Sequence, residues 1–314
     1  MNATIQTTIR TEGLTKRFGK NDALSGVQLS VPEGSIFALV GPNGAGKTTL
    51  IKLAMNLLRP TAGTAWVLGK ASETMTGRDL NRIGYVSENQ EYPEWMTVGA
   101  MLEYLRPFYP QWDVALERQL VAGFDLPLDR KLKQLSRGMK MKAAMAGALA
   151  FRPALLVLDE PFSGLDPLVR DELIEGLLDC SPETTVFLSS HDLSEIESFS
   201  SHIAYLEQGR LLFSEEMAVL SERFREVTVT LGGPRLEGKL PGTWLGVEAT
   251  DAVVKFVHSD CHGEATVAEI RQWFPDAKAL SLQPMPLRSI FLAVARSERA
   301  GRAQRGAAQE RRPA

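Results

Sequence analysis

One decapeptide constrains the fold of this chain more than any other stretch: GPNGAGKTTL, residues 41–50, directly after the apolar run IFALV at 36–40. Its glycine and lysine spacing, G-x-x-x-x-G-K-T, is that of a phosphate-binding loop between a buried strand and a helix. Glycines let successive backbone N–H groups turn toward one anion, and the helix N-terminus adds partial positive charge. A plain glycine-rich turn with an incidental lysine is the alternative, but it does not account for the flanking strand and helix. Lys47 is expected to reach the terminal phosphates of a nucleotide, and the Thr48 hydroxyl to bind Mg²⁺.

A pair of carboxylates follows a second apolar run. Leu155–Leu158 leads into Asp159 and Glu160, and ligands bind at the carboxyl ends of the strands in open α/β sheets. Asp159 is expected to hold a metal through a water molecule, and Glu160 to orient or deprotonate the water that attacks a phosphate. Taken alone, the same Asp-Glu-Pro sequence is also a good turn and helix cap.

Two further motifs make the pattern specific: LSRGM at 135–139 and SGLD at 163–166. On its own, Ser136 is a good N-cap for the following helix. Together with the phosphate loop and the acidic pair, in this order, the motifs make residues 9–216 resemble the nucleotide-binding subunit of an ABC transporter. The implied fold is α/β: a P-loop NTPase cassette with a mixed sheet core, a β subdomain and a helical subdomain.

The resemblance implies roles for individual residues. The implied catalytic residues are Glu160 and His191, which follows the strand at 186–190. The alternative is that both are structural, His191 as a histidine without a catalytic role and Glu160 as part of a turn and helix cap. Contacts to ATP held by an opposite cassette are implied for Ser136, Gly138 and Asp166. Arg137 replaces a glycine of the family's LSGGQ signature and Met139 replaces its glutamine, so phosphate contact should survive and sugar contact should weaken. The implied nucleotide-binding residues are Phe18 (stacking on adenine, or else a core aromatic), Gly41, Pro42, Asn43, Gly44, Ala45, Gly46, Lys47, Thr48 and Thr49.

The Mg²⁺ ligands implied by the family are Thr48, Asp159 and a glutamine after Ile-Gly-Tyr. Here the sequence departs from the family, because direct alignment puts Glu88 at that position, whereas Gln90 fits only with a small register shift. Either side chain offers an oxygen ligand. The expected cofactors are therefore ATP and Mg²⁺, with the choice between Glu88 and Gln90 open.

The periodicity of the rest of the chain suggests three segments. Residues 9–216 form the cassette, with helical composition over about 88–150 at 101–108, 114–124 and 137–150. Residues 217–300 predict a small α/β domain with strands at 227–230 and 253–257 and helices at 267–273 and 287–297. The remaining residues, 301–314, are low in apolar side chains and are expected to be disordered.

The composition of the chain limits the kinds of binding partner that are expected. The chain has 35 basic and 38 acidic residues and a net charge of −3, so no nucleic-acid partner is expected. Cys180 and Cys261 fit neither a disulfide framework nor a Cys-x-x-Cys metal site. The polar N-terminus lacks the apolar core of a signal peptide, and no apolar run is long enough to span a bilayer. A membrane role would therefore act through a partner.

The resemblance supplies those partners and the expected function. It implies a second cassette, as homodimer or heterodimer, and a separate multi-span membrane permease contacted by the aromatic region at 88–112, with the chain cytoplasmic and peripheral on the inner membrane face. The segments at 105–113 and 286–292 resemble ATPases of bacterial peptide-antibiotic and multidrug exporters. The expected function is ATP hydrolysis that energises transport, with export favoured. The alternative is a soluble ABC ATPase acting on ribosomes or DNA, but such proteins usually have two cassettes or a long coiled-coil insertion.

Overall fold

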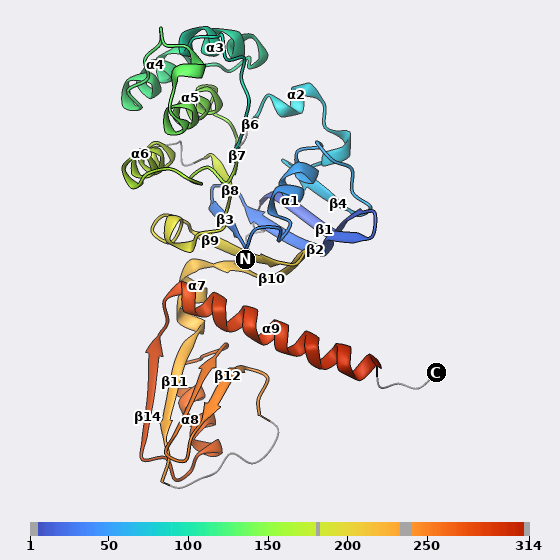
Figure 1. Cartoon of the computed structure of the whole chain (residues 1–314), viewed down its shortest axis with the longest axis vertical. Coiled ribbons are helices and arrows are strands. Elements are labelled where there is room, and N and C mark those ends of the chain that lie inside the picture. Colours follow the sequence, from blue (N-terminus) through green and yellow to red (C-terminus); the bar gives the residue numbers. More distant parts are fainter. Residues whose placement is uncertain (1–5, 89, 180–182, 233–239, 311–314) are drawn as a thin grey trace. The chain divides into compact units, whose positions relative to one another are not determined.

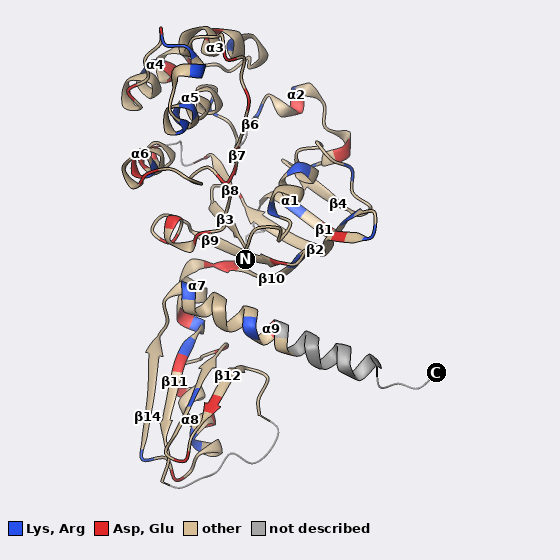
Figure 2. Cartoon of the chain, viewed as in Figure 1, with Lys and Arg blue, Asp and Glu red and all other residues tan. Residues whose placement is uncertain are grey.

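The computed structural model describes residues 6–88, 90–179, 183–232 and 240–310, which divide into two compact units (Figure 1). The N-terminal unit is Met1–Ser214 and the C-terminal unit is Glu215–Ala314. The sequence pattern places this boundary two residues later, after residue 216. Acidic and basic side chains are interspersed along both units (Figure 2). Among the described helices, none combines the length and apolar character that crossing a bilayer requires.

The N-terminal unit begins with an antiparallel sheet. Its strand order is β2 (Asn21–Pro32), β1 (Thr7–Phe18), β4 (Ala62–Val67) and β5 (Lys70–Ala71). In β2, alternate residues from Val27 to Val31 are buried, which is the pattern of a sheet with one face on the core. In β1, register shifts interrupt this alternation. This sheet matches the β subdomain that the resemblance implies.

A six-stranded sheet carries the predicted motifs. Its strand order is β10 (Arg210–Glu216), β9 (His202–Glu207), β3 (Ile36–Val40), β8 (Thr185–Ser190), β7 (Leu155–Asp159) and β6 (Ile83–Ser87). From β9 to β6 every neighbouring pair is parallel, so their carboxyl ends meet at one edge. The helices α1 (Lys47–Ala54) and α6 (Pro167–Leu178) follow β3 and β7. The apolar runs Leu155–Leu158 of β7 and Val186–Leu188 of β8 are wholly buried.

A group of helices lies between β6 and β7 in the chain (Figure 1). The helices α3 (Val98–Leu105), α4 (Val114–Gly123) and α5 (Arg137–Leu149) begin at the side-chain N-caps Thr97, Asp113 and Ser136, and a short α2 (Gly77–Leu80) precedes β6. The helix α5 is rich in alanine and buried from Met141 to Leu149, because small side chains let it pack closely against its neighbours. The three helices predicted here are confirmed.

The C-terminal unit has its own antiparallel sheet, of order β12 (Trp244–Ala249), β13 (Val253–His258), β11 (Arg225–Thr230) and β14 (Ala279–Pro284). Its helices are α7 (Met217–Arg223), α8 (Glu264–Trp273) and α9 (Leu287–Glu310). The core contains Val227, Val229 and Phe256, with the Trp244 and Phe256 rings stacked at 4.1 Å between centroids. The two predicted strands and two predicted helices are confirmed.

The structure of the tail differs from the expectation. Its composition predicts disorder from Gly301 onward, but α9 continues through this segment to Glu310, and residues 311–314 lie outside the described residues. The physical reason is that the tail contains mostly Ala, Arg, Gln and Glu, which are good helix formers and can extend a helix already begun in the apolar segment before them.

Candidate functional site

The phosphate loop connects β3 to α1 with the geometry that its glycines predict. Gly44 and Gly46 have φ of +79° and +110°, and a Cβ on Gly46 would lie 2.5 Å from the carbonyl oxygen of Ala23. Only glycine fits there without strain. The buried Lys47 amine donates hydrogen bonds to the carbonyls of Gly41 (2.6 Å) and Pro42 (3.3 Å). Lys47 therefore links the end of the loop to its beginning through these hydrogen bonds.

The first carboxylate of the acidic pair is held against the loop. The Thr48 hydroxyl donates to Asp159 Oδ1 at 3.1 Å, and the Ser189 hydroxyl on the neighbouring strand β8 donates to the same oxygen at 2.6 Å. The parallel register pairs Asp159 with Ser189, which explains why these side chains meet. Asp159 and Ser189 are buried. These two hydrogen bonds bring the Thr48 hydroxyl, the Ser189 hydroxyl and Asp159 Oδ1 together at the edge of the sheet.

The second carboxylate lies between two nitrogen groups. Glu160 Oε1 is 2.9 Å from the Lys47 amine, and Glu160 Oε2 is 2.7 Å from His191 Nδ1. The Glu160 backbone has φ of +53°, and its N–H donates to Ser189 Oγ at 3.0 Å. The hydrogen bond to Glu160 raises the pKa of His191 above its ordinary value, against the opposing effect of partial burial. The structure thus brings together Lys47, Glu160 and His191.

Lys47 and Glu160, but not His191, border a pocket of about 240 Å³ around the phosphate loop. The pocket is lined by Ala23, Asn43, Gly44, Ala45, Gly46, Lys47, Thr48, Thr49, Glu88 and Glu160. Loop residues and two carboxylates from the sheet edge therefore face one space. Phe18 lies at the end of β1 with its side chain exposed, and the Lys16 amine lies 5.0 Å from the centre of its ring. Exposure rules out the alternative that Phe18 is a core aromatic.

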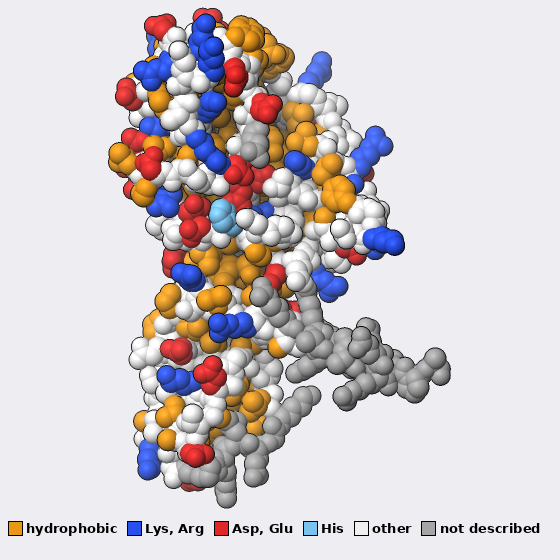
Figure 3. Space-filling model, in the orientation of Figure 1, with side chains coloured by type: hydrophobic (Ala, Val, Ile, Leu, Met, Phe, Trp, Pro, Cys, Tyr) orange, Lys and Arg blue, Asp and Glu red, His pale blue; other side chains and the backbone are white. Residues whose placement is uncertain are grey.

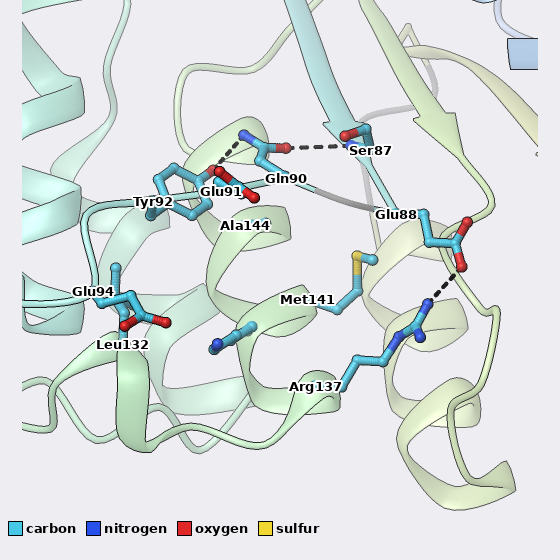
Figure 4. Close-up of a pocket in the computed structure, with 11 residues that line it drawn as sticks. Ser87, Glu88, Gln90, Glu91, Tyr92, Glu94, Leu132, Arg137, Met141 and Ala144 are labelled. Carbon is cyan, nitrogen blue, oxygen red and sulfur yellow. Dashed lines mark hydrogen bonds and ion pairs between the residues drawn. The ribbon is translucent and has the colours of Figure 1, made fainter.

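The two alternative Mg²⁺ ligands have different surroundings. Glu88 borders the phosphate-loop pocket, and its backbone N–H donates to the carbonyl of Asp159 at 2.9 Å. Gln90 is not among the residues that line this pocket. Its side chain accepts from the Ser87 N–H at 3.2 Å and donates to the Tyr92 hydroxyl at 2.7 Å, as Figure 4 shows. The geometry therefore favours Glu88.

Of the three predicted trans-contact residues, Ser136 and Asp166 are helix N-caps and Gly138 lies in the first turn of α5, all outside this pocket. Ser136 accepts from the Met139 N–H at the start of α5, and Asp166 accepts from the Val169 N–H at the start of α6. Gly138 is buried where α5 meets α6, and a Cβ there would lie 2.8 Å from Val169 Cγ1. None of the three lines the phosphate-loop pocket of its own chain. Within one chain, these residues serve as caps and as a packing contact.

Two serines contribute to the site without having been predicted. Ser189 connects Asp159 and Glu160, and Ser163 donates to Glu88 Oε1 at 3.0 Å. The available signal was the pair of hydroxyl residues, Ser189 and Ser190, that ends the otherwise apolar strand β8. A polar side chain at the carboxyl end of a buried strand needs a hydrogen-bond partner.

A second hollow of about 410 Å³ lies between the segment after β6 and the helix α5 (Figure 4). Its lining mixes charged, aromatic and apolar side chains: Ser87, Glu88, Gln90, Glu91, Tyr92, Glu94, Leu132, Arg137, Lys140, Met141 and Ala144. Nearby, large apolar side chains are exposed on the helical part of the N-terminal unit (Figure 3), among them Trp95 (71% exposed), Tyr104 and Phe108. This part of the surface is suited to contact with another protein.

The fold and the site define a P-loop nucleotide-binding cassette: a phosphate loop after a central parallel strand, with an acidic pair at the end of a second strand. Comparison with known families makes this specific, since residues 24–163 match the family described as "ABC transporter". The chain belongs to the family of ABC transporter ATP-binding proteins.

Two of the relatives are matched by this chain over most of their own length. The chain is 31% identical to the daunorubicin/doxorubicin resistance ATP-binding protein DrrA of Streptomyces peucetius, with 100% of each chain covered. It is 34% identical to the bacitracin transport ATP-binding protein BcrA of Enterococcus faecalis, covering 70% of this chain and 73% of that protein. The chain spans 58% and 59% of the length of two cyanobacterial relatives, from Synechocystis and Nostoc, both uncharacterized ABC transporter ATP-binding proteins.

Solved structures agree with this assignment. An ATP-binding subunit of an ABC transporter matches with a TM-score of 0.63 and 27% identity, covering 68% of this chain and 92% of that chain. The expected fold class and the expected family are thus confirmed.

Proposed function

We propose that this chain hydrolyses ATP and thereby drives export of a substrate through a separate membrane permease. The observation that carries the proposal is that a buried lysine, a carboxylate and a histidine, Lys47, Glu160 and His191, lie within hydrogen-bond distance in series beside the phosphate loop. The loop supplies donors for the phosphates, and the acidic edge supplies a base for water.

In this proposal each group has a defined task. The β- and γ-phosphates of ATP bind to the loop N–H groups and to the Lys47 ammonium, which leaves Glu160 when it pairs with phosphate. The released Glu160 carboxylate accepts a proton from the attacking water, and His191 holds the other carboxylate oxygen and contacts the γ-phosphate. Phe18, exposed at its hairpin, stacks on adenine. Water attacks the γ-phosphorus in line, the bond from that phosphorus to the β–γ bridging oxygen breaks, and ADP and inorganic phosphate leave.

The residues around the loop fit a magnesium ion. Mg²⁺ binds oxygen ligands and usually shares them between one or two carboxylates and the substrate's phosphates. The Thr48 hydroxyl lies 3.1 Å from the Asp159 carboxylate, and Thr48 lines the pocket together with Glu88. The hydroxyl and the two carboxylates would form such a donor set. When bound, the ion would offset the negative charge of the phosphates.

A second cassette would complete the site. Ser136, Gly138 and Asp166 do not line the pocket of their own chain, yet two of them stand at helix N-termini, where backbone N–H groups favour anions. In a head-to-tail pair, ATP on Lys47 of one chain would face Ser136 of the other. ATP binding would close the pair, and hydrolysis would open it.

The permease would bind where apolar side chains are exposed. Trp95, Tyr104 and Phe108 lie in or near the segment 88–112 and are more than half exposed, and the hollow beside α5 adjoins the same segment. The names of the relatives BcrA and DrrA, which refer to bacitracin transport and to drug resistance, support export of antibiotic-like compounds. The chain would then act at the cytoplasmic face of the membrane.

The decisive experiment on the chemistry is the substitution Glu160→Gln. It removes the base but keeps the size of the side chain, so ATP should still bind with an affinity near that of the wild type. The rate of hydrolysis should fall by about 10²- to 10⁴-fold, and ATP-bound pairs should accumulate on a sizing column. The matched control is Glu197→Gln, at an exposed position after His191, which should hydrolyse at the wild-type rate. Hydrolysis by Glu160→Gln at that same rate would show the assignment to be wrong.

The same variant tests the partner. Tagged Glu160→Gln protein, solubilised gently from cells with and without Mg-ATP, should co-purify with a multi-span membrane protein identified by mass spectrometry. Recovery of ribosomal or DNA-repair proteins with no membrane chain would instead assign the same ATPase chemistry to a soluble role.

A further inference from the structure

Two of the three positions at which this sequence departs from the family's nucleotide-site pattern, 137 and 88, are in contact. Arg137 stands where the signature has a glycine, and Glu88 stands where the family has a glutamine. They are 49 residues apart in sequence, and Arg137 Nη2 lies 2.8 Å from Glu88 Oε1 (Figure 4). The Ser163 hydroxyl donates to the same oxygen at 3.0 Å. The two departures therefore form one ion pair with a serine attached.

Glu88 occupies a position between two cavities. It lines both the phosphate-loop pocket and the hollow beside α5, and its backbone is tied to the carbonyl of Asp159. Arg137 lines only the second of these two cavities. The charge that a nucleotide meets at this wall is thus the Glu88 carboxylate, while Arg137 lies behind it.

The Arg137 guanidinium, although its side chain is 49% exposed, also lies against a turn. A Cβ on Gly164, which has φ of +68°, would lie 3.3 Å from Arg137 Nη1, so the guanidinium lies against the Ser163–Gly164 turn. A glutamine at position 88 would be neutral and need no counter-ion. A glutamate there faces the triphosphate with the same sign of charge, and like charges brought together weaken binding.

We propose that Arg137 is a positioning residue for nucleotide binding, which holds the Glu88 carboxylate and offsets its charge at the wall of the phosphate-loop pocket. Arginine at 137 and glutamate at 88 then act as a matched pair that replaces a neutral glycine and glutamine. This inference rests on the proposed function, because it takes ATP as the ligand of that pocket.

A double-mutant cycle tests the pair. The proteins are the full chain as wild type, Arg137→Ala, Glu88→Gln and the double variant, and the measurement is the Kd of ATP by calorimetry, in EDTA and in Mg²⁺. In EDTA, Arg137→Ala should weaken ATP binding on the order of fivefold when Glu88 is present, and by less than about 1.5-fold in the Glu88→Gln background. Arg137→Lys keeps the charge and should recover part of the affinity.

The matched control is the ion pair between Arg152 and Asp113. It is similarly exposed, at 57% and 30% against 49% and 33% for Arg137 and Glu88, and its N–O distance is 2.9 Å. Neither of its residues lines the phosphate-loop pocket. The cycle built from Arg152→Ala and Asp113→Asn should leave the Kd of ATP unchanged, so that loss of a surface ion pair alone is distinguished from loss of this one.

The outcomes separate the two proposals. If Arg137→Ala weakens binding equally in the wild-type and the Glu88→Gln backgrounds, or in neither, Arg137 does not act through Glu88 and the inference is overturned. If the wild-type chain itself binds no ATP, the proposed function fails first. A melting temperature for each variant identifies loss of folding, and in that case Arg137→Gln, which keeps most of the side-chain length but not the charge, supplies the same comparison in both backgrounds.

Discussion

Replacing Ser189 by alanine should destabilise the N-terminal unit far more than the loss of one hydroxyl suggests. The Ser189 side chain is fully buried on β8, where it donates to Asp159 Oδ1 at 2.6 Å and accepts from the Glu160 N–H at 3.0 Å. Alanine fits the same space but makes neither bond. Asp159 keeps its bond from Thr48, whereas the Glu160 amide loses its acceptor in a buried position.

The size of the effect follows from these two bonds. A hydrogen bond to a charged group contributes about 1.5–3 kcal/mol, and a buried amide left without a partner costs about 1–3 kcal/mol. Allowing for overlap between the two terms, Ser189→Ala should lower the free energy of unfolding by about 2–4 kcal/mol. For a unit of this size each kcal/mol shifts the melting temperature by roughly 2–4 °C. The transition of the N-terminal unit should therefore fall by roughly 5–15 °C.

Differential scanning calorimetry of the whole chain measures this shift, and Ser200→Ala is its matched control. Ser200 is also buried, but its hydroxyl has no hydrogen-bond partner among the described residues, so its removal should change stability by less than about 0.5 kcal/mol. The reasoning is refuted if the two serine variants melt within about 2 °C of each other. Ser189→Ala should also have a lower kcat for ATP hydrolysis than the wild type, because the same hydroxyl accepts the hydrogen bond from the Glu160 N–H.

Two other variants test the site from different directions. Gly138→Ala should lower the free energy of unfolding by about 1–2 kcal/mol in urea denaturation, because its Cβ would lie 2.8 Å from Val169 Cγ1; adding Val169→Ala should restore stability, and no recovery would refute the packing argument. The raised pKa of His191 means that its bond to Glu160 stabilises the fold fully below the ordinary pKa of histidine, about 6.5, and less as the pH rises through the raised value. The melting-temperature difference between wild type and His191→Gln should therefore shrink from about pH 6 to pH 9, and a constant difference would contradict the assignment.

The parts of the site that the sequence predicts are those made by neighbouring residues. The spacing from Gly41 to Thr48 specifies the loop because the required backbone freedom and the lysine lie within eight consecutive positions. Asp159 and Glu160 could be placed at the sheet edge because an apolar strand precedes them, and the carboxyl ends of parallel strands meet there. In each case the chemistry depends on local geometry that a short pattern determines.

The parts that could not be predicted depend on contacts across the fold. Ser189 reaches Asp159 only because β8 and β7 are parallel neighbours in one particular register. The choice between Glu88 and Gln90 depends on how the chain turns after β6, and both lie in the same turn, so the pattern alone leaves it open. The helix beyond Gly301 depends on α9 having already begun, which a composition count does not include.

The ion pair between Glu88 and Arg137 shows why departures from a motif have to be interpreted together. In sequence, a glutamate at a metal-ligand position and an arginine in a glycine signature are two separate defects. In the structure their atoms are 2.8 Å apart, and each side chain supplies the charge that the other requires. Reverting position 137 alone leaves the Glu88 carboxylate unpaired at the wall of the nucleotide pocket, and reverting position 88 alone leaves Arg137 unpaired in the hollow beside α5. The physical unit is therefore the pair, and only Glu88→Gln combined with a neutral residue at position 137 removes both charges together.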